Sequence, residues 1–98
     1  MARVSMRKVT KKPADVQWWF MIEPVKAAII KKFCYEYEGL TIEYSKPDDN
    51  TIITNFTFDS EEIFGKFMID MHGTSAFASR TTYNTQNGVT ETNHITAA

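Results

Sequence analysis

The sequence has little of several features that would narrow its class. Its one cysteine, Cys34, cannot form a disulfide within the chain. Its longest apolar run covers residues 18–22, far short of the roughly 20 residues that span a bilayer. The basic stretch at residues 1–16 is not followed by an apolar segment of the length typical of secretion signals. We therefore expect no membrane segment and a cytoplasmic location.

Motifs of enzyme chemistry are also missing. The sequence has no Ser/His/Asp or Cys/His pattern and no glycine-rich loop of the kind that binds phosphate. Asp70 and His72 are too close in sequence to share a helical face, and His94 stands alone on an expected strand. The sequence thus predicts no catalytic residue, no metal site and no cofactor.

Charge is unevenly distributed along the chain. The net charge is −1, but residues 1–14 contain five basic residues and no acidic one. This basic arm consists of Arg3, Arg7, Lys8, Lys11 and Lys12. It could contact phosphate, or it could protect an edge strand from aggregation. The second explanation is favoured because only the arm is basic and the pI is about 6.1, so we expect no nucleic-acid binding.

Length and periodicity indicate one domain, residues 1–98, that starts with a strand. With 98 residues and 43% apolar residues, the chain can form a single core. In residues 2–10, Val4 and Met6 alternate with polar side chains, which is the pattern of a half-buried strand. Pro13 ends that strand, because proline has no N–H for the ladder.

Residues 16–22 (VQWWFMI) allow two interpretations. They could form a buried strand, or a segment that covers the edge of the core with Trp18, Trp19 and Phe20. A helix begins at once with Glu23-Pro24, which leaves almost no loop after a strand. The covering segment is therefore the favoured interpretation.

Residues 24–39 predict the clearest helix, with Pro24 at its first position and Gly39 as its left-handed end. Cys34 lies on its apolar stripe, which favours a small core residue over a nucleophile. The expected stripe contains Val25, Ile29, Ile30, Phe33, Cys34 and Tyr37.

A hairpin and a second helix follow. Residues 40–45 and 51–58 alternate as strands on either side of KPDDN, which is built from turn-forming residues. The next helix begins near Asp59 and Glu62, which have capping-box spacing, and ends at Gly73. Its expected apolar stripe is Ile63, Phe64, Phe67, Met68 and Met71.

Asn87-Gly88 could close a β-hairpin or end a helix. Phe77, Arg80 and Tyr83 recur at helical spacing, so we predict a short helix over residues 75–85, capped by Thr74 or Ser75. Gly88 would then have a positive φ, and residues 89–95 would form the last strand.

This order predicts an α+β, ferredoxin-like fold, β-α-β-β-α-α-β, with helices on one face of an antiparallel sheet. The first and third strands should be central. The open face should be polar and rich in threonine. Its expected members are Arg3, Ser5, Arg7, Thr41, Glu43, Ser45, Ile53, Asn55, Thr57, Thr90, Thr92 and His94.

Two resemblances agree with this fold. The element order and Tyr83-Asn84 with Asn87-Gly88-Val89 resemble small ferredoxin-like proteins encoded by marine T4-like phages and metagenomic reading frames. The architecture is also similar to dimeric α/β-barrel proteins, including antibiotic-biosynthesis monooxygenases. That similarity implies a dimer and a pocket that uses Asn, Trp or His side chains.

Three functional hypotheses follow. The first is a non-enzymatic, homodimeric interaction or accessory module that uses the open sheet face or an edge strand. The second is a small-molecule-binding or monooxygenase-like barrel, with Trp18, Trp19, Asn55 and His94 as candidate ligand-binding residues. The third is an RNA-recognition-like protein, disfavoured because Phe56 and Phe58 of the NFTF segment should point inward.

Overall fold

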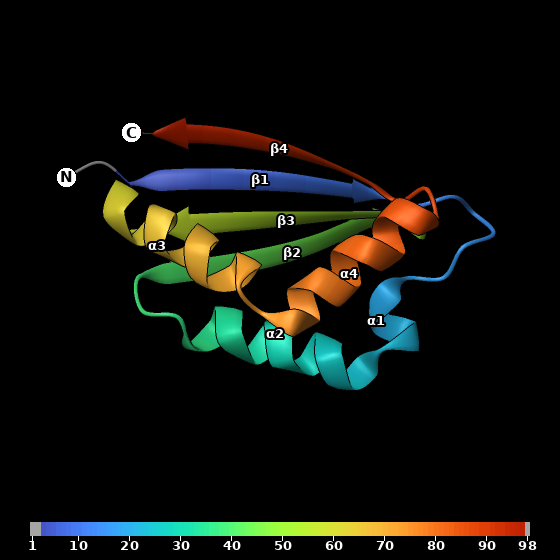
Figure 1. Cartoon of the computed structure of the whole chain (residues 1–98). Coiled ribbons are helices and arrows are strands. Elements are labelled where there is room, and N and C mark those ends of the chain that lie inside the picture. Colours follow the sequence, from blue (N-terminus) through green and yellow to red (C-terminus); the bar gives the residue numbers. More distant parts are fainter. Residues whose placement is uncertain (1–2, 98) are drawn as a thin grey trace.

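The computed structural model describes residues 3–97 and shows four strands and four helices within them. Their order is β1 (Val4–Lys11), α1 (Trp19–Ile22), α2 (Pro24–Glu36), β2 (Leu40–Asp48), β3 (Thr51–Phe58), α3 (Glu61–His72), α4 (Ser75–Gln86) and β4 (Thr90–Ala97). Figure 1 shows these elements as a sheet layer and a helix layer.

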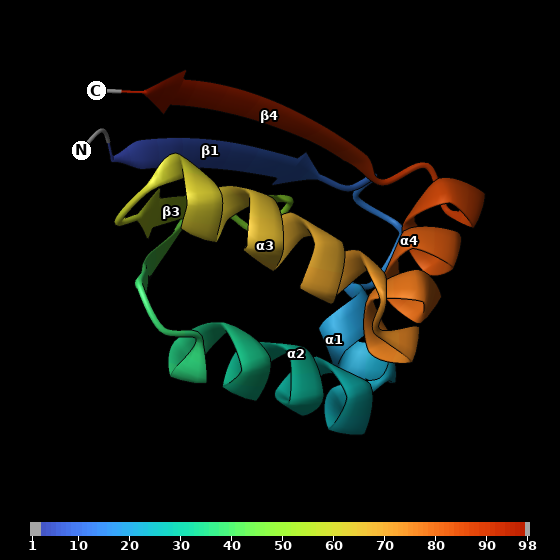
Figure 2. The same ribbon diagram turned by 60° about the vertical axis from the view of Figure 1, so that its left-hand side comes forward.

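The strands form one antiparallel sheet in the order β2-β3-β1-β4. The first and third strands are central, so the ferredoxin-like prediction is confirmed. The four helices lie on one side of the sheet, as Figure 2 shows, and no helix of the described residues covers the other side. The strand register places Arg7 between Asn55 and His94 on that open face, as the alternation predicted. Among residues 3–97, no helix is long and apolar enough to cross a membrane.

The core lies between the sheet and helices α2 and α3. Phe58 and Phe67 are almost fully buried at its centre, with their ring centroids 5.2 Å apart. Val4, Met6 and Phe56 add the inward faces of the two central strands. The apolar stripe predicted for α3 is confirmed, because Phe67 and Met71 are buried and Ile63, Phe64 and Met68 pack against the same cluster.

The stripe predicted for α2 is partly wrong. Cys34 is buried, and Ile30, Phe33 and Tyr37 pack beside it, but Val25 and Ile29 are 74% and 53% exposed. Val25 is nine residues before Cys34, which is about two and a half turns at 3.6 residues per turn. The two side chains therefore point to opposite sides of the helix. Four-residue spacing alone did not show on which side the core would lie.

Residues 16–22 are not a strand, and their last four residues form helix α1. Trp18 and Trp19 are buried as predicted, whereas Phe20 is 42% exposed. The cap predicted for α3 is also corrected. The Ser60 hydroxyl, and not Asp59, accepts a hydrogen bond from the Ile63 backbone N–H.

Asn87-Gly88 ends a helix, as predicted. Helix α4 is capped at its start by the Thr74 hydroxyl, and Gly88 follows its end with a φ of +73°. The chain then enters β4, which pairs with β1. The end of α4 thus brings Arg80 and Asn84 of this helix into contact with Glu91 of β4.

Candidate functional site

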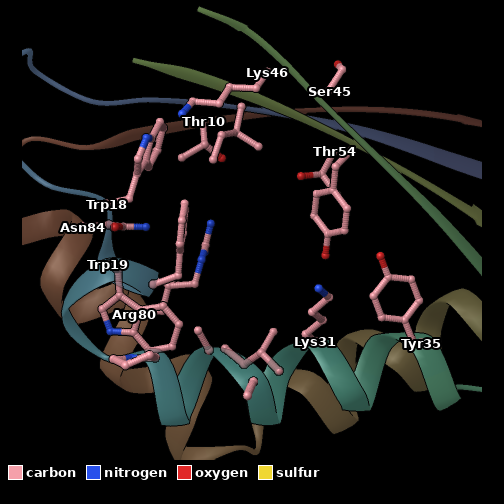
Figure 3. Close-up of a pocket in the computed structure, with 17 residues that line it drawn as sticks. Thr10, Trp18, Trp19, Lys31, Tyr35, Ser45, Lys46, Thr54, Arg80 and Asn84 are labelled. Carbon is pink, nitrogen blue, oxygen red and sulfur yellow. The ribbon is translucent and has the colours of Figure 1, made fainter. Parts of the chain in front are cut away.

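A cavity of about 640 Å³ lies between the sheet and helices α1, α2 and α4. Figure 3 shows its lining, with Trp18 and Trp19 at one end and Lys31 and Tyr35 rising from α2. Thr10 and Thr54 reach it from the central strands. A volume of this size falls within the range of about 300–1,000 Å³ that is typical of small-molecule pockets.

Aromatic side chains wall one end of the cavity. Trp18, Trp19 and Phe20 all line it, and the rings of Trp18 and Phe20 stack with centroids 6.0 Å apart. They come from the segment that the sequence predicted as a cover. With Pro24, Ala27, Ala28, Ile30 and Ile52 they make much of the lining apolar. Such a wall suits a flat, apolar ring system.

Hydrogen bonds hold this aromatic segment in place. The Trp18 indole N–H donates to the Asp49 carbonyl in the turn between β2 and β3, at 3.2 Å. The Tyr83 hydroxyl of α4 donates to the Gln17 carbonyl at 2.6 Å. The Lys12 ammonium lies 5.6 Å from the centre of a Trp18 ring. The segment is thus fixed to both the sheet and α4, and the wall is formed before any ligand binds.

Hydroxyl groups lie on the sheet and α2 sides of the cavity. Thr10 and Thr54 are buried, and Tyr35 and Tyr44 are about half exposed. Partial burial, with smaller effects from Cys34 and Tyr35, raises the pKa of Tyr44 to about 12. The Tyr44 phenol is therefore protonated at neutral pH and can donate a hydrogen bond to a ligand.

Charged groups meet where α4 faces β4. The Arg80 guanidinium forms an ion pair with Glu91, and the Asn84 amide donates to the same carboxylate at 3.2 Å. Arg80 and Asn84 are one helical turn apart, so they share the inward face of α4. Glu91 pairs with Thr10 in the sheet register, which turns its side chain toward the helices. Arg80 and Asn84 also line the cavity, as Figure 3 shows.

Lys8 joins the same cluster from the middle of the sheet. It lies two residues from Thr10 on the inward face of β1, and its ammonium is 3.9 Å from the Glu91 carboxylate. Burial, followed by the nearby Arg80 charge, lowers the pKa of Lys8 below its usual 10.5. The cluster therefore contains two basic side chains and one carboxylate in a largely desolvated place.

Cys34 lies near this cluster, but its surroundings disfavour the reactive thiolate. Its burial raises the pKa of the thiol to about 11, against smaller opposing effects from Lys8 and Arg80. Less than a hundredth of such a thiol is ionised at neutral pH, and the thiolate is the reactive form. The prediction that Cys34 is a small core residue is confirmed by its 2% exposure.

The candidate ligand-binding residues lie at two separate places. Trp18 and Trp19 line the large cavity on the helix side. Asn55 and His94 lie on the open face of the sheet, on either side of Arg7, and line a smaller depression of about 270 Å³. The structure therefore does not join the four residues into one site.

The cluster of Lys8, Arg80, Asn84 and Glu91 was not predicted, although the sequence contains two signals for it. Arg80 and Asn84 have i, i+4 spacing within the helix that was predicted there. Strand alternation that puts Thr90 and Thr92 on the open face also puts Glu91 on the helix side. Combining the two would have placed a cation, an amide and a carboxylate together.

Comparisons with known proteins show the fold. No protein-family model matches the chain, and no curated protein matches it. A conserved Bacteroides thetaiotaomicron protein of unknown function, a candidate oxidoreductase, has a TM-score of 0.65 at 11% identity, over 99% of this chain and 98% of its own.

Two further solved structures are similar. SnoaB from Streptomyces nogalater, a cofactor-independent oxygenase solved as a point mutant, has a TM-score of 0.62 at 12% identity, over 98% of this chain and 92% of its own. A candidate antibiotic biosynthesis monooxygenase from Deinococcus radiodurans has a TM-score of 0.59 at 10% identity, over 97% and 89%. This chain has the ferredoxin-like α+β fold that these proteins share.

Proposed function

We propose that this protein binds a small aromatic molecule in the cavity between its sheet and helices α1, α2 and α4. The observation that carries the proposal is the 640 Å³ cavity itself, walled by Trp18, Trp19 and Phe20. Burying a flat ring against this wall removes apolar surface from water on both partners. The threonine and tyrosine hydroxyls opposite supply the few polar contacts that fix a ligand's orientation.

A titration with 2-naphthol tests binding. Both tryptophans of the chain lie at the cavity, so their fluorescence reports directly on its occupancy. We expect quenching with one site per chain. Ala28→Trp should abolish it, because Ala28 lines the cavity and the added indole would occupy space that a bound ring needs. The matched control is Ala78→Trp on the exposed side of α4.

The control variant should bind as the unmodified protein does. Calorimetry gives the affinity independently of the new tryptophan's fluorescence. Naphthol binding that survives Ala28→Trp, or no saturable binding by the unmodified protein, would contradict the proposal.

Oxidation of the bound molecule is the second candidate function. It is favoured by the fold shared with SnoaB, a cofactor-independent oxygenase, over nearly the whole chain. Fold alone does not carry chemistry, so the activity needs its own test. With 1-naphthol and O₂, a ring C–H and the phenol would become the two carbonyls of 1,4-naphthoquinone. The two hydrogens and the second oxygen atom would leave as one water, with the naphthol as electron donor.

An oxygen electrode and the quinone absorbance measure this reaction. The second candidate predicts oxygen uptake that equals quinone formed and that Ala28→Trp removes. Saturable naphthol binding without oxygen uptake would leave ligand binding as the function. The hypothesis of a homodimeric interaction module stays a prediction, as does cytoplasmic location.

A further inference from the structure

The charged residues that line the cavity all carry the same sign of charge. Within residues 3–97, three of the lining side chains are basic, namely Lys31, Lys46 and Arg80, and none is acidic. A ligand in the cavity therefore meets basic side chains from α2, β2 and α4, while the carboxylate of Glu91 forms an ion pair with one of them, Arg80.

Arg80 is the basic group best placed to recognise a ligand. Its side chain is 19% exposed, and Glu91 holds it through an ion pair that Asn84 supports from the next turn of α4. An arginine held in this way loses little further freedom when it binds an anion. Its guanidinium has five N–H donors, so the bond to Glu91 leaves others for a second acceptor.

Charge balance in the cluster points the same way. Lys8 and Arg80 both face Glu91, and their side chains are only 13% and 19% exposed. Two cations against one carboxylate leave one positive charge without a partner in a place that water reaches poorly. Buried charge of this kind is unfavourable until a group of opposite sign neutralises it.

We infer that the ligand of this cavity is an aromatic anion, a carboxylate or phenolate, whose charged oxygen is bound by Arg80 while its ring packs against Trp18, Trp19 and Phe20. This inference rests on the proposed function and adds the charge of the ligand to it. Glu91 and Asn84 act as positioning residues for the guanidinium. Lys8 supplies the excess charge from the sheet side.

Two isosteric probes test the charge directly. The 2-naphthoate ion and neutral 2-naphthamide have the same ring and nearly the same shape, and calorimetry gives the affinity of each. We expect naphthoate to bind at least about tenfold more tightly than naphthamide, because charge-assisted hydrogen bonds are stronger than neutral ones. Arg80→Gln should lower naphthoate affinity to the level of the amide and leave amide binding within about threefold. The matched control, Arg7→Gln, removes an arginine from the open face and should change neither.

A second variant keeps the test decisive if Arg80→Gln does not fold. Glu91→Gln removes the carboxylate of the cluster and keeps its size and hydrogen-bonding oxygen. Naphthoate affinity should rise several-fold in it, because the bound anion no longer competes with Glu91 for Arg80. A merely structural role for Glu91 would instead lower the affinities of both probes.

The outcomes separate the two claims. Equal affinities for naphthoate and naphthamide would overturn the inference about charge and leave the proposed binding function standing. Weaker binding of naphthoate than of naphthamide would overturn it as well. No binding of either probe would also overturn the inference, and the 2-naphthol titration would then decide the proposed function separately.

Discussion

Lys8 lies on the inward face of β1, where its ammonium faces Arg80, Glu91 and Cys34. Its ammonium also lies 6.0 and 5.8 Å from the centres of the Phe56 and Phe77 rings. Burial lowers the pKa of Lys8 in the folded protein, whereas in the unfolded chain its pKa stays at about 10.5. Between the lowered folded pKa and 10.5 the unfolded chain holds more protons, and stability rises with pH.

Lys8→Met should remove that rise. The methionine keeps the stem in place and no longer buries a charge, while Glu91 retains Arg80 and Asn84. We expect the variant to be as stable as the unmodified protein at neutral pH, or more stable by up to about 1 kcal/mol. The difference in unfolding free energy between Lys8→Met and the unmodified protein should shrink as pH increases. Urea unfolding at several pH values measures this difference.

Two features make the comparison specific. Cys34 has a pKa raised from 9.0 to about 11 and so lowers stability above pH 9, and Lys8 lowers that pKa, so both proteins are compared in a Cys34→Ala background that removes the thiol. Lys32→Met on the exposed side of α2 is the matched control and should leave the pH profile unchanged. A constant difference between Lys8→Met and the unmodified protein at all pH values would contradict the buried-charge account.

At the scale of helices and strands, the sequence predicted most of the fold because local signals carry it. Alternation set the inward faces of the strands, and Pro24 and Gly88 marked helix ends by their allowed backbone angles. Gly39 was wrongly predicted as the end of α2, because the helix stops at Glu36 and the positive φ of Gly39 belongs to the turn that leads into β2. The exposed side of α2 was mispredicted since Val25 and Ile29 look like core residues locally. Only the packing of α2 around Cys34 shows which side is buried.

The glycines at element ends give a graded prediction. Gly39 has a φ of +84°, and a Cβ there would lie 2.6 Å from the Ile63 Cδ1 atom. Gly88 has a φ of +73°, but its nearest contact would be an ordinary 3.6 Å from Pro13 Cγ. Gly88→Ala should therefore cost about 1 kcal/mol of unfolding free energy and Gly39→Ala about 2–3 kcal/mol.

Gly65→Ala provides the control for the same substitution. Gly65 lies inside α3 with no atom near the position of a Cβ, so alanine should stabilise by about 0.5–1 kcal/mol. Denaturant unfolding of the three variants gives all three values. An equal cost at Gly39 and Gly88 would mean that the contact with Ile63 relaxes and that backbone strain alone is measured.

At the scale of the whole molecule, the cavity depends on how far the helices lie from the sheet, and no local sequence pattern predicts that distance. The cavity takes residues from three strands and from α1, α2 and α4, with Thr10 and Asn84 far apart in sequence. Trp18 and Trp19 were predicted as candidate ligand-binding residues, and both line the cavity. Asn55 and His94 were predicted together with them but lie on the opposite, open face of the sheet. Residue types alone do not say on which face of a sheet a site lies.

The central claim is that an aromatic anion occupies this cavity, with its charge at Arg80. A ¹H–¹⁵N NMR titration with 2-naphthoate tests it most directly, because each backbone amide and both indole N–H groups report separately. The account predicts that the saturating shifts cluster at Trp18, Trp19, Thr54, Arg80 and Asn84, with Asn55 and His94 on the open face unmoved. Shifts centred on Asn55 and His94, or no saturating shifts at the cavity, would contradict it.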